Sequence, residues 1–147
     1  MMRTPLAWLI MLSASSPAMA DGLTIKPGQW EQNTTASATM MAGGNSASMP
    51  VKTEITAECL LGDDARIDPA TIDQEGCNLS DVTQDGRVLT YTMVCQRGPV
   101  EMDGTMKLTV SEDGTRVDRA IAMSGRHDTG IEITSSIIIS SRWTGDC

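Results

Sequence analysis

The side chains that most often perform catalysis are scarce in this sequence. His127 is its only histidine, and it lies in an Arg-His-Asp turn, while no Gly-x-Ser-x-Gly elbow is present. Nucleophilic catalysis needs a base beside a serine or cysteine, so we interpret His127 as a solvated turn residue. The 19 acidic residues offer carboxylate pairs for glycoside hydrolysis, but only three Trp and one Tyr are available to line a sugar cleft. The sequence therefore predicts a protein that is not an enzyme and has no cofactor.

Two groups of residues have the chemistry to bind metal ions. Methionine thioethers are soft ligands that suit Cu(I), and Met40, Met41 and Met49 flank a Gly-Gly-Asn turn. No histidine or cysteine lies near them in sequence, so packing near a hairpin tip is the favoured interpretation. The acidic stretch from Asp63 to Glu75 lacks the Asp-x-Asp-x-Asp-Gly spacing of a calcium loop. The prediction is that neither group holds a metal.

Residues 1–20 have the three regions of a secretory signal peptide. Arg3 supplies the positive start, Leu6–Leu12 is an apolar run too short to span a bilayer, and an Ala-Met-Ala cleavage site ends at Ala20. We expect cleavage between Ala20 and Asp21 and export to the periplasm. No later apolar run approaches the roughly 18 residues of a membrane span, so no membrane anchor is predicted.

The mature chain, 21–147, has the length of a single domain. The full sequence has a net charge of −8, and removal of Arg3 with the signal peptide makes the mature domain more acidic, at −9. Nucleic acid and anionic lipid surfaces repel such a protein. The charge therefore argues against both as partners.

All four cysteines follow the predicted cleavage site. An even number of cysteines in an exported chain indicates disulfides, here two among Cys59, Cys77, Cys95 and Cys147. If the Asp-Gly pair at 85–86 forms a tight turn, Cys77 and Cys95 come within one residue of direct opposition, and a bulge would join them. Cys59 would then pair with Cys147, although a strict up-and-down meander places Cys147 at the opposite end from the others. The sequence leaves the connectivity open.

Apolar and polar residues alternate along most of the mature chain, as in β-strands with one buried face. A first strand is expected from Gln29 toward Met40. The later strands are expected at Val51–Cys59, Arg87–Cys95, Thr105–Ser111, Val117–Met123 and Ile131–Trp143. Asp-Gly pairs at 85–86 and 113–114 predict hairpin turns, and Gly62–Gly76 is expected to be a loop with short helical turns near Asp63 and Pro69. The predicted fold is all-β, an antiparallel meander of about six to seven strands curled into a barrel or half-barrel, with a small sandwich as the alternative.

The strand pattern also predicts which side chains face the core. Leu89, Tyr91, Met93 and Cys95 share one face of their strand, and Met106, Leu108 and Val110 share one face of the next. Val51, Thr53, Ile55, Ala57 and Cys59 form the less polar face of another. Arg119 is a misfit, since it falls on the apolar face that Val117 and Ile121 define.

Short motifs occur in a recognisable order along the mature chain. Residues 26–31 read Lys-Pro-Gly-Gln-Trp-Glu, a Met-Pro pair stands at 49–50, four cysteines follow, and residues 141–147 read Ser-Arg-Trp-Thr-Gly-Asp-Cys. This order resembles the bacterial exported family called domain of unknown function 3617, over residues 24–147. The sequence departs from the family pattern at 62–64, where Gly-Asp-Asp replaces a Thr-Pro-Glu-like helix start. The resemblance implies compartment and architecture, because the family has no established activity.

The isoleucine-rich strand at Ile131–Trp143 gives the functional hypotheses. It is interpreted first as a core strand, with Ile138 alone on the polar face. The functional alternative is a binding module for a small apolar or lipid-like ligand, held on a concave face. The residues expected there are Leu89, Met93, Leu108, Ile131 and Ile133. A second hypothesis is an interaction with an envelope protein through an exposed strand edge, and a copper site ranks third.

Overall fold

The computed structural model describes residues 22–72 and 76–147. The predicted signal peptide and its cleavage site therefore lie outside the described residues, as do Asp73 and Glu75 of the acidic stretch. In the described part of the chain no α-helix occurs, and no helix is long and apolar enough to cross a membrane.

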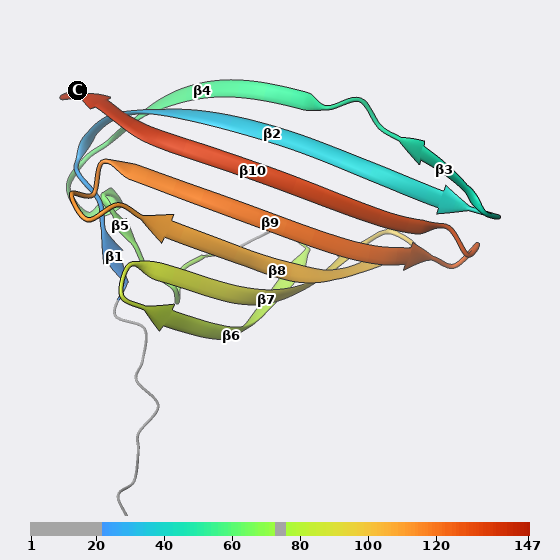
Figure 1. Cartoon of the computed structure of the whole chain (residues 1–147). Helices are drawn as coiled ribbons and strands as arrows, with labels where there is room; N and C mark the ends of the chain where they lie inside the picture. Colours follow the sequence, from blue (N-terminus) through green and yellow to red (C-terminus); the bar gives the residue numbers. More distant parts are fainter. Residues whose placement is uncertain (1–21, 73–75) are drawn as a thin grey trace, which may run out of the picture.

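Residues 22–72 and 76–147 form ten strands and one short 3-10 turn (Figure 1). In chain order the elements are β1 (Leu23–Thr24), β2 (Gly28–Ala42), β3 (Asn45–Ser48), β4 (Lys52–Leu60), the 3-10 turn η1 (Gly62–Asp64), β5 (Arg66–Ile67), β6 (Cys77–Asp85), β7 (Val88–Arg97), β8 (Val100–Val110), β9 (Arg116–His127) and β10 (Glu132–Gly145). The predicted all-β class and the antiparallel meander are confirmed.

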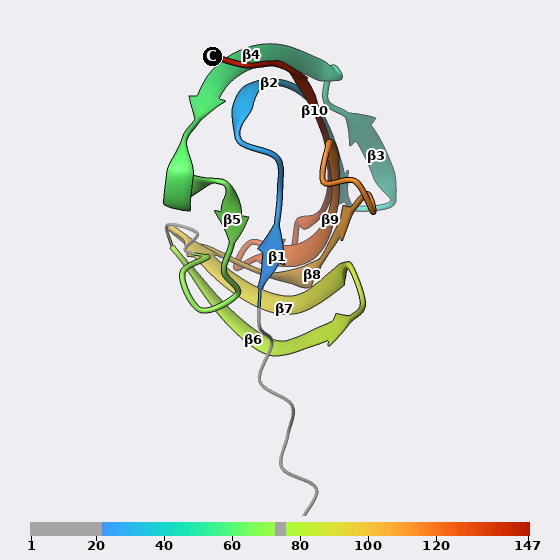
Figure 2. The ribbon, with the colours of Figure 1, turned by 90° about the vertical axis from the view of Figure 1, so that its left-hand side faces the viewer.

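One eight-stranded sheet has the order β3-β2-β10-β9-β8-β7-β6, and β4 continues along the β3 side of β2. All of its strand pairs are antiparallel. β4 and β6 lie at its two edges and do not pair with each other, so the sheet is not closed, and the expectation of a barrel is wrong. Figure 2 shows the sheet curving around β1 and β5. We call the side that faces these two strands the concave face.

Residues 61–72, which we call the crossing segment, lie between β4 and β6. β4 ends where Leu60 pairs with the start of β2, and β6 begins at the opposite end of the sheet. Within this segment β5 pairs with β1, with Leu23 opposite Ile67. The helical turns expected here are only partly present. Asp63 lies inside the 3-10 turn and does not cap it, and Pro69 begins a tight turn closed by a bond from the Thr71 N–H to the Asp68 carbonyl.

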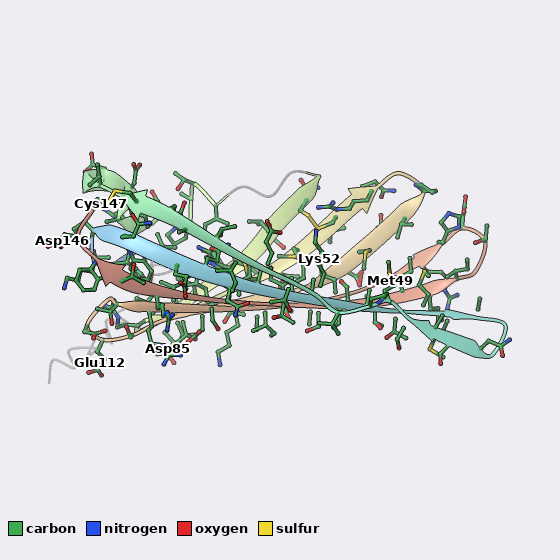
Figure 3. The ribbon with its side chains drawn as sticks, turned by 90° about the horizontal axis from the view of Figure 1, so that it is seen from above. Met49, Lys52, Asp85, Glu112, Asp146 and Cys147 are labelled. Carbon is green, nitrogen blue, oxygen red and sulfur yellow. A yellow bond between two sulfur atoms is a disulfide. The ribbon has the colours of Figure 1, made fainter. Side chains whose placement is uncertain are left out.

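Two disulfides are present, Cys77–Cys95 (the hairpin disulfide) and Cys59–Cys147 (the end disulfide). The predicted bulge lies in β6, where Asp81 and Val82 occupy the space opposite one residue of β7. A strict meander would place Cys147 at the opposite end of the sheet from Cys59. The chain departs from a strict meander after β4, because β6 begins at the other end of the sheet from the end of β4. β4 and β10 both flank β2 and finish at the same end of the sheet, where Figure 3 shows Cys147. The two disulfides are consistent with export.

The concave face carries the core, as the alternation predicted for most strands. The four β7 side chains expected to be buried have exposures of 1% or less. β4 is the exception, because it pairs with Trp30 opposite Glu58 and so turns its charged row toward the concave side. Val51 and Ile55 point the other way and are 64% and 65% exposed. The alternation in β4 was read correctly, but the face expected to pack was wrong, since an edge strand has cover on neither face.

Two strands extend further than the sequence predicted. β8 begins at Val100 and β9 continues to His127, because each runs through a glycine that interrupts the apolar pattern. A Cβ on Gly104 would lie 2.1 Å from the Ala122 carbonyl oxygen, and one on Gly125 would lie 2.3 Å from the Glu101 carbonyl oxygen. These glycines therefore permit a close approach of neighbouring backbones where the sheet bends.

Candidate ligand-binding cavity

A cavity of about 510 Å³ lies between the crossing segment and the concave face. Six of the eleven described lining residues are apolar, and the other five are three arginines, one aspartate and one threonine. They are formed by Arg66, Ile67, Asp68, Thr71 and Ile72 of the crossing segment and by Arg97, Met106, Leu108, Arg119, Ile121 and Ile139 of the sheet. The cavity thus combines an apolar surface with a few charged groups, which is the usual make-up of small-molecule sites.

Arg119 supplies a charge from within the apolar face of β9. It pairs across the sheet with Leu108 on one side and Ile139 on the other. Its Nε atom is buried and has no hydrogen-bond partner among the described residues. Burial lowers the pKa of Arg119, and the negative charge of Glu58 opposes that effect. The side chain stays cationic, since the guanidinium pKa is far above neutrality.

Tyr91 is the second polar group beneath this face. Its side chain is 0% exposed, and its hydroxyl has no hydrogen-bond partner in the described part of the structure. Burial raises the pKa of Tyr91, as does the charge of Asp68, while the charge of Arg119 lowers it. Tyr91 is therefore a neutral hydroxyl donor within electrostatic range of two charged residues that line the cavity.

Asp68 is the acidic residue among the described residues that line the cavity, and its carboxylate accepts a hydrogen bond within the crossing segment. Its Oδ1 atom accepts a hydrogen bond from the Ala70 N–H at 2.9 Å, and its carbonyl accepts one from the Thr71 hydroxyl at 3.2 Å. Such an Asx turn fixes the local backbone. Asp68 therefore helps to shape the crossing segment.

The five residues expected to bind an apolar ligand fall on one face but not at one place. Leu108 lines the cavity. Leu89 and Met93 are 0% and 1% exposed and are packed in the core beside it. Ile133 is half-buried near the other end of β10, and Ile131 precedes that strand in its turn. Arg119 was visible in the sequence only as a charge out of pattern, which is the signal that should have marked it as a site residue.

The remaining candidate residues do not form a reactive group. Met40 and Met41 are adjacent on β2 and so point to opposite faces of the sheet. The three methionines therefore do not converge on one ion. His127 ends β9, where its Nδ1 atom lies 2.7 Å from the Thr129 hydroxyl. Within residues 22–72 and 76–147 no cluster of three His, Cys, Asp or Glu side chains has the arrangement of a metal site.

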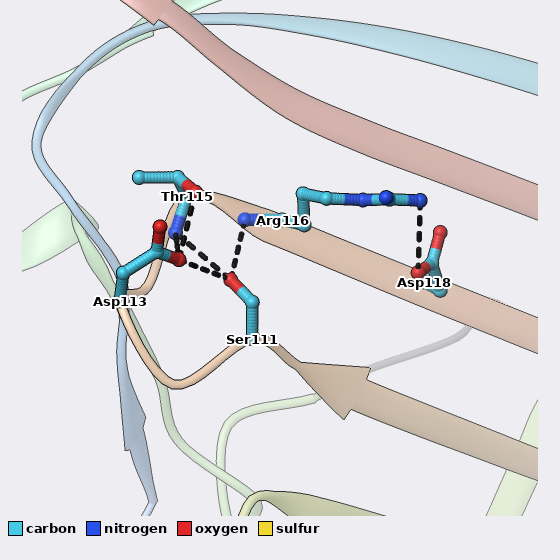
Figure 4. Close-up of polar contacts among 5 residues, drawn as sticks. All are labelled: Ser111, Asp113, Thr115, Arg116 and Asp118. Atoms are coloured by element: carbon cyan, nitrogen blue, oxygen red, sulfur yellow. Dashed lines mark hydrogen bonds and ion pairs between the residues drawn. The ribbon is translucent and has the colours of Figure 1, made fainter.

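The β8–β9 turn holds the end of the sheet that contains Arg119. Asp113 accepts hydrogen bonds from the hydroxyls of Ser111 and Thr115 at 2.7 and 2.8 Å (Figure 4). These bonds lower the pKa of Asp113 to about 2. The carbonyl of the next residue, Gly114, accepts a 2.9 Å hydrogen bond from the Lys26 N–H. The turn is thereby attached to the chain between β1 and β2.

The first and last sequence motifs meet at this same end. Trp30 and Trp143 are directly opposed on β2 and β10, and each indole N–H bonds a carbonyl of the link before β2. The Lys26 ammonium lies 3.5 Å from the Trp143 ring centroid, a cation–π contact. Gly28 has φ +137°, and a Cβ there would lie 2.3 Å from the Trp143 indole nitrogen. The motifs therefore close one end of the fold, and the end disulfide holds that closure.

Residues 25–147 match the family described as "protein of unknown function (DUF3617)". The match covers most of the chain, so this protein belongs to the DUF3617 family. No curated protein and no solved structure matches the chain.

Proposed function

We propose that this domain is a non-enzymatic periplasmic binding module that holds a small apolar or lipid-like ligand in its half-barrel. The observation that carries the proposal is the cavity of about 510 Å³ under the crossing segment. Small-molecule sites commonly have volumes of roughly 300–1,000 Å³ and mostly apolar walls. The signal sequence and the two disulfides support the periplasmic compartment.

The walls support an apolar ligand in particular. Ile67 and Ile72 approach from the crossing segment, and Met106, Ile121 and Ile139 approach from the sheet. Aliphatic and thioether side chains offer dispersion contacts and gain by excluding water from a hydrocarbon surface. A chain of methylene groups is the simplest ligand that such walls fit.

The arrangement of reactive groups supports binding in preference to catalysis. His127 is the last residue of β9, and its partly exposed side chain contacts Thr129 and Asp128. It belongs to the hairpin that joins β9 to β10, and it is not among the residues that line the cavity. A general base needs hydrogen-bond reach to the group that it deprotonates, and no histidine offers that reach within the cavity.

Native mass spectrometry of the protein purified from its own periplasm tests the proposal. We expect a chain of residues 21–147 with two disulfides, carrying an additional mass that dissociates on activation and behaves as a lipid. A matched pair of variants localises it. Ile139→Trp should fill the cavity and remove the bound mass, whereas Ile138→Trp, on the opposite face of the same strand, should retain it. Protein without any bound mass, under conditions that preserve other lipid complexes, would refute the proposal.

A second candidate function is an envelope interaction at the β4 edge. The outer backbone edge of this nine-residue strand pairs with no described strand, and eight of its residues are exposed. Such an edge can accept a partner strand, although its charged side chains also discourage casual pairing. A photo-crosslinking residue at Ile55 should give one discrete adduct in the periplasm, while the same residue at exposed Val94 should give none. Equal labelling at both positions would eliminate this candidate.

A further inference from the structure

Two arginines at the cavity have a charge opposite to that of the whole protein. The chain has a net charge of −8, yet Arg97 and Arg119 are among the described residues that line the cavity, together with one described acid, Asp68. The carboxylate of Asp68 also accepts a backbone hydrogen bond within its own turn. The local potential therefore favours an anion in a protein whose overall charge repels anions at long range.

Arg119 offers a donor that the fold itself does not use. The buried Nε lacks a hydrogen-bond partner, and Arg119 forms no ion pair with any carboxylate in the described residues. Glu58 influences its pKa without ion-pair contact. Buried polar groups are normally satisfied by a protein group, water or a ligand. Since Nε is itself buried, an acceptor in the cavity would meet the part of the Arg119 side chain that lines it.

We propose that the cavity binds a single-chain amphiphilic anion, a long-chain carboxylate, with its head group at Arg119. A carboxylate presents two acceptor oxygens in one plane, which suits a guanidinium group. Its hydrocarbon chain lies along Ile121, Ile139 and Leu108. This inference rests on the proposed function, and it adds the chemical class of the head group.

Isothermal titration calorimetry with three twelve-carbon probes, each below its aggregation concentration, tests separately whether the cavity binds an apolar chain and whether it prefers a carboxylate head group. The probes are dodecanoate, dodecanol and dodecylammonium, and the protein is the mature, oxidised chain. We expect dodecanoate to bind at least ten-fold more tightly than dodecanol, because a charge-assisted hydrogen bond is worth about one to two factors of ten. Dodecylammonium should bind most weakly.

Matched variants assign the preference to the site. Arg119→Met should abolish the preference for dodecanoate while dodecanol still binds. Arg126→Met is the control, because Arg126 is on the same strand but is exposed and paired with Glu132. Equal affinity for all three probes, or a preference that survives Arg119→Met, would overturn the head-group assignment and leave the apolar cavity standing. Absence of binding by every probe would overturn the proposed function as well.

Discussion

Replacement of Arg119 by methionine should make the protein more stable. The guanidinium Nε is buried without a hydrogen bond, and burial lowers the pKa of Arg119, which means that the fold disfavours its charge. Methionine has a similar reach and packs against Leu108 and Ile139, the cross-strand neighbours of Arg119. Glu58 is exposed, so removal of the arginine leaves no buried carboxylate without a counter-charge. A binding residue that lowers stability is a common compromise in functional sites.

The size of the effect follows from the unpaired donor. A buried polar group without a partner costs about 1–3 kcal/mol, and Arg119 keeps some solvent contact, so we expect Arg119→Met to raise the free energy of unfolding by about 1–2 kcal/mol. For a domain of this length that corresponds to a rise in Tm of about 3–8 °C. Urea denaturation and thermal melting, both with the disulfides intact, measure the change.

Arg126→Met is the control variant for this measurement. It should change the free energy of unfolding by no more than about 0.5 kcal/mol, because the ion pair of Arg126 with Glu132 is exposed. If Arg119→Met instead lowers stability by more than 1 kcal/mol, Arg119 makes a favourable interaction in the fold. A double-mutant cycle with Glu58→Gln would then identify the partner. That outcome would remove the argument that Arg119 is reserved for a ligand.

Three further predictions concern the scaffold. Gly104→Ala should lower the free energy of unfolding by about 2–3 kcal/mol, since its Cβ would meet a carbonyl oxygen at 2.1 Å; a change below 0.5 kcal/mol by urea denaturation would contradict the close approach. Loss of the end disulfide, which closes 88 residues, should cost about 4.6 kcal/mol, and loss of the hairpin disulfide, which closes 18, about 3 kcal/mol; paired Cys→Ser variants test that order, and the reverse order would refute it. The Asp113 carboxyl should titrate near pH 2 by NMR, not at its ordinary 3.8. Because its folded pKa is the lower one, its stabilising contribution is complete above about pH 4 and disappears as the pH falls toward 2, and Asp113→Asn should abolish this dependence.

Sequence patterns were reliable where a strand is covered on one face only. The inward rows of β7 and β8 followed from alternation, because their concave side packs and their other side meets water. The tight turns followed from glycine and aspartate chemistry. The observed turn of the β6–β7 hairpin is displaced by one residue from the predicted turn, since Asp85 opposes Val88. The predicted bulge is present in β6, and Cys77 lies directly opposite Cys95.

Other features depended on interactions between distant residues. β1 and β5 have two residues each and exist because they pair with each other inside the curved sheet. The orientation of β4 was decided by its register against β2, with Glu58 opposite the buried Trp30, which no local pattern encodes. The cavity arises because the crossing segment passes over the concave face, bringing Ile67 and Ile72 against Ile121 and Ile139. Arg119, the charged residue that β9 contributes to the cavity, was nevertheless visible in the sequence, because it interrupts the apolar face that Val117 and Ile121 define.

The family motifs and the proposed site occupy different parts of the molecule. Lys26, Gly28, Trp30 and Trp143 contact one another at the end of the sheet that the end disulfide closes. None of the four is among the residues that line the cavity. These motifs therefore join β2 to β10 at one end of the sheet, whereas the cavity lies between the crossing segment and the concave face. If the proposed head-group assignment holds, the preference in the three-probe titration depends on Arg119 and not on these four residues.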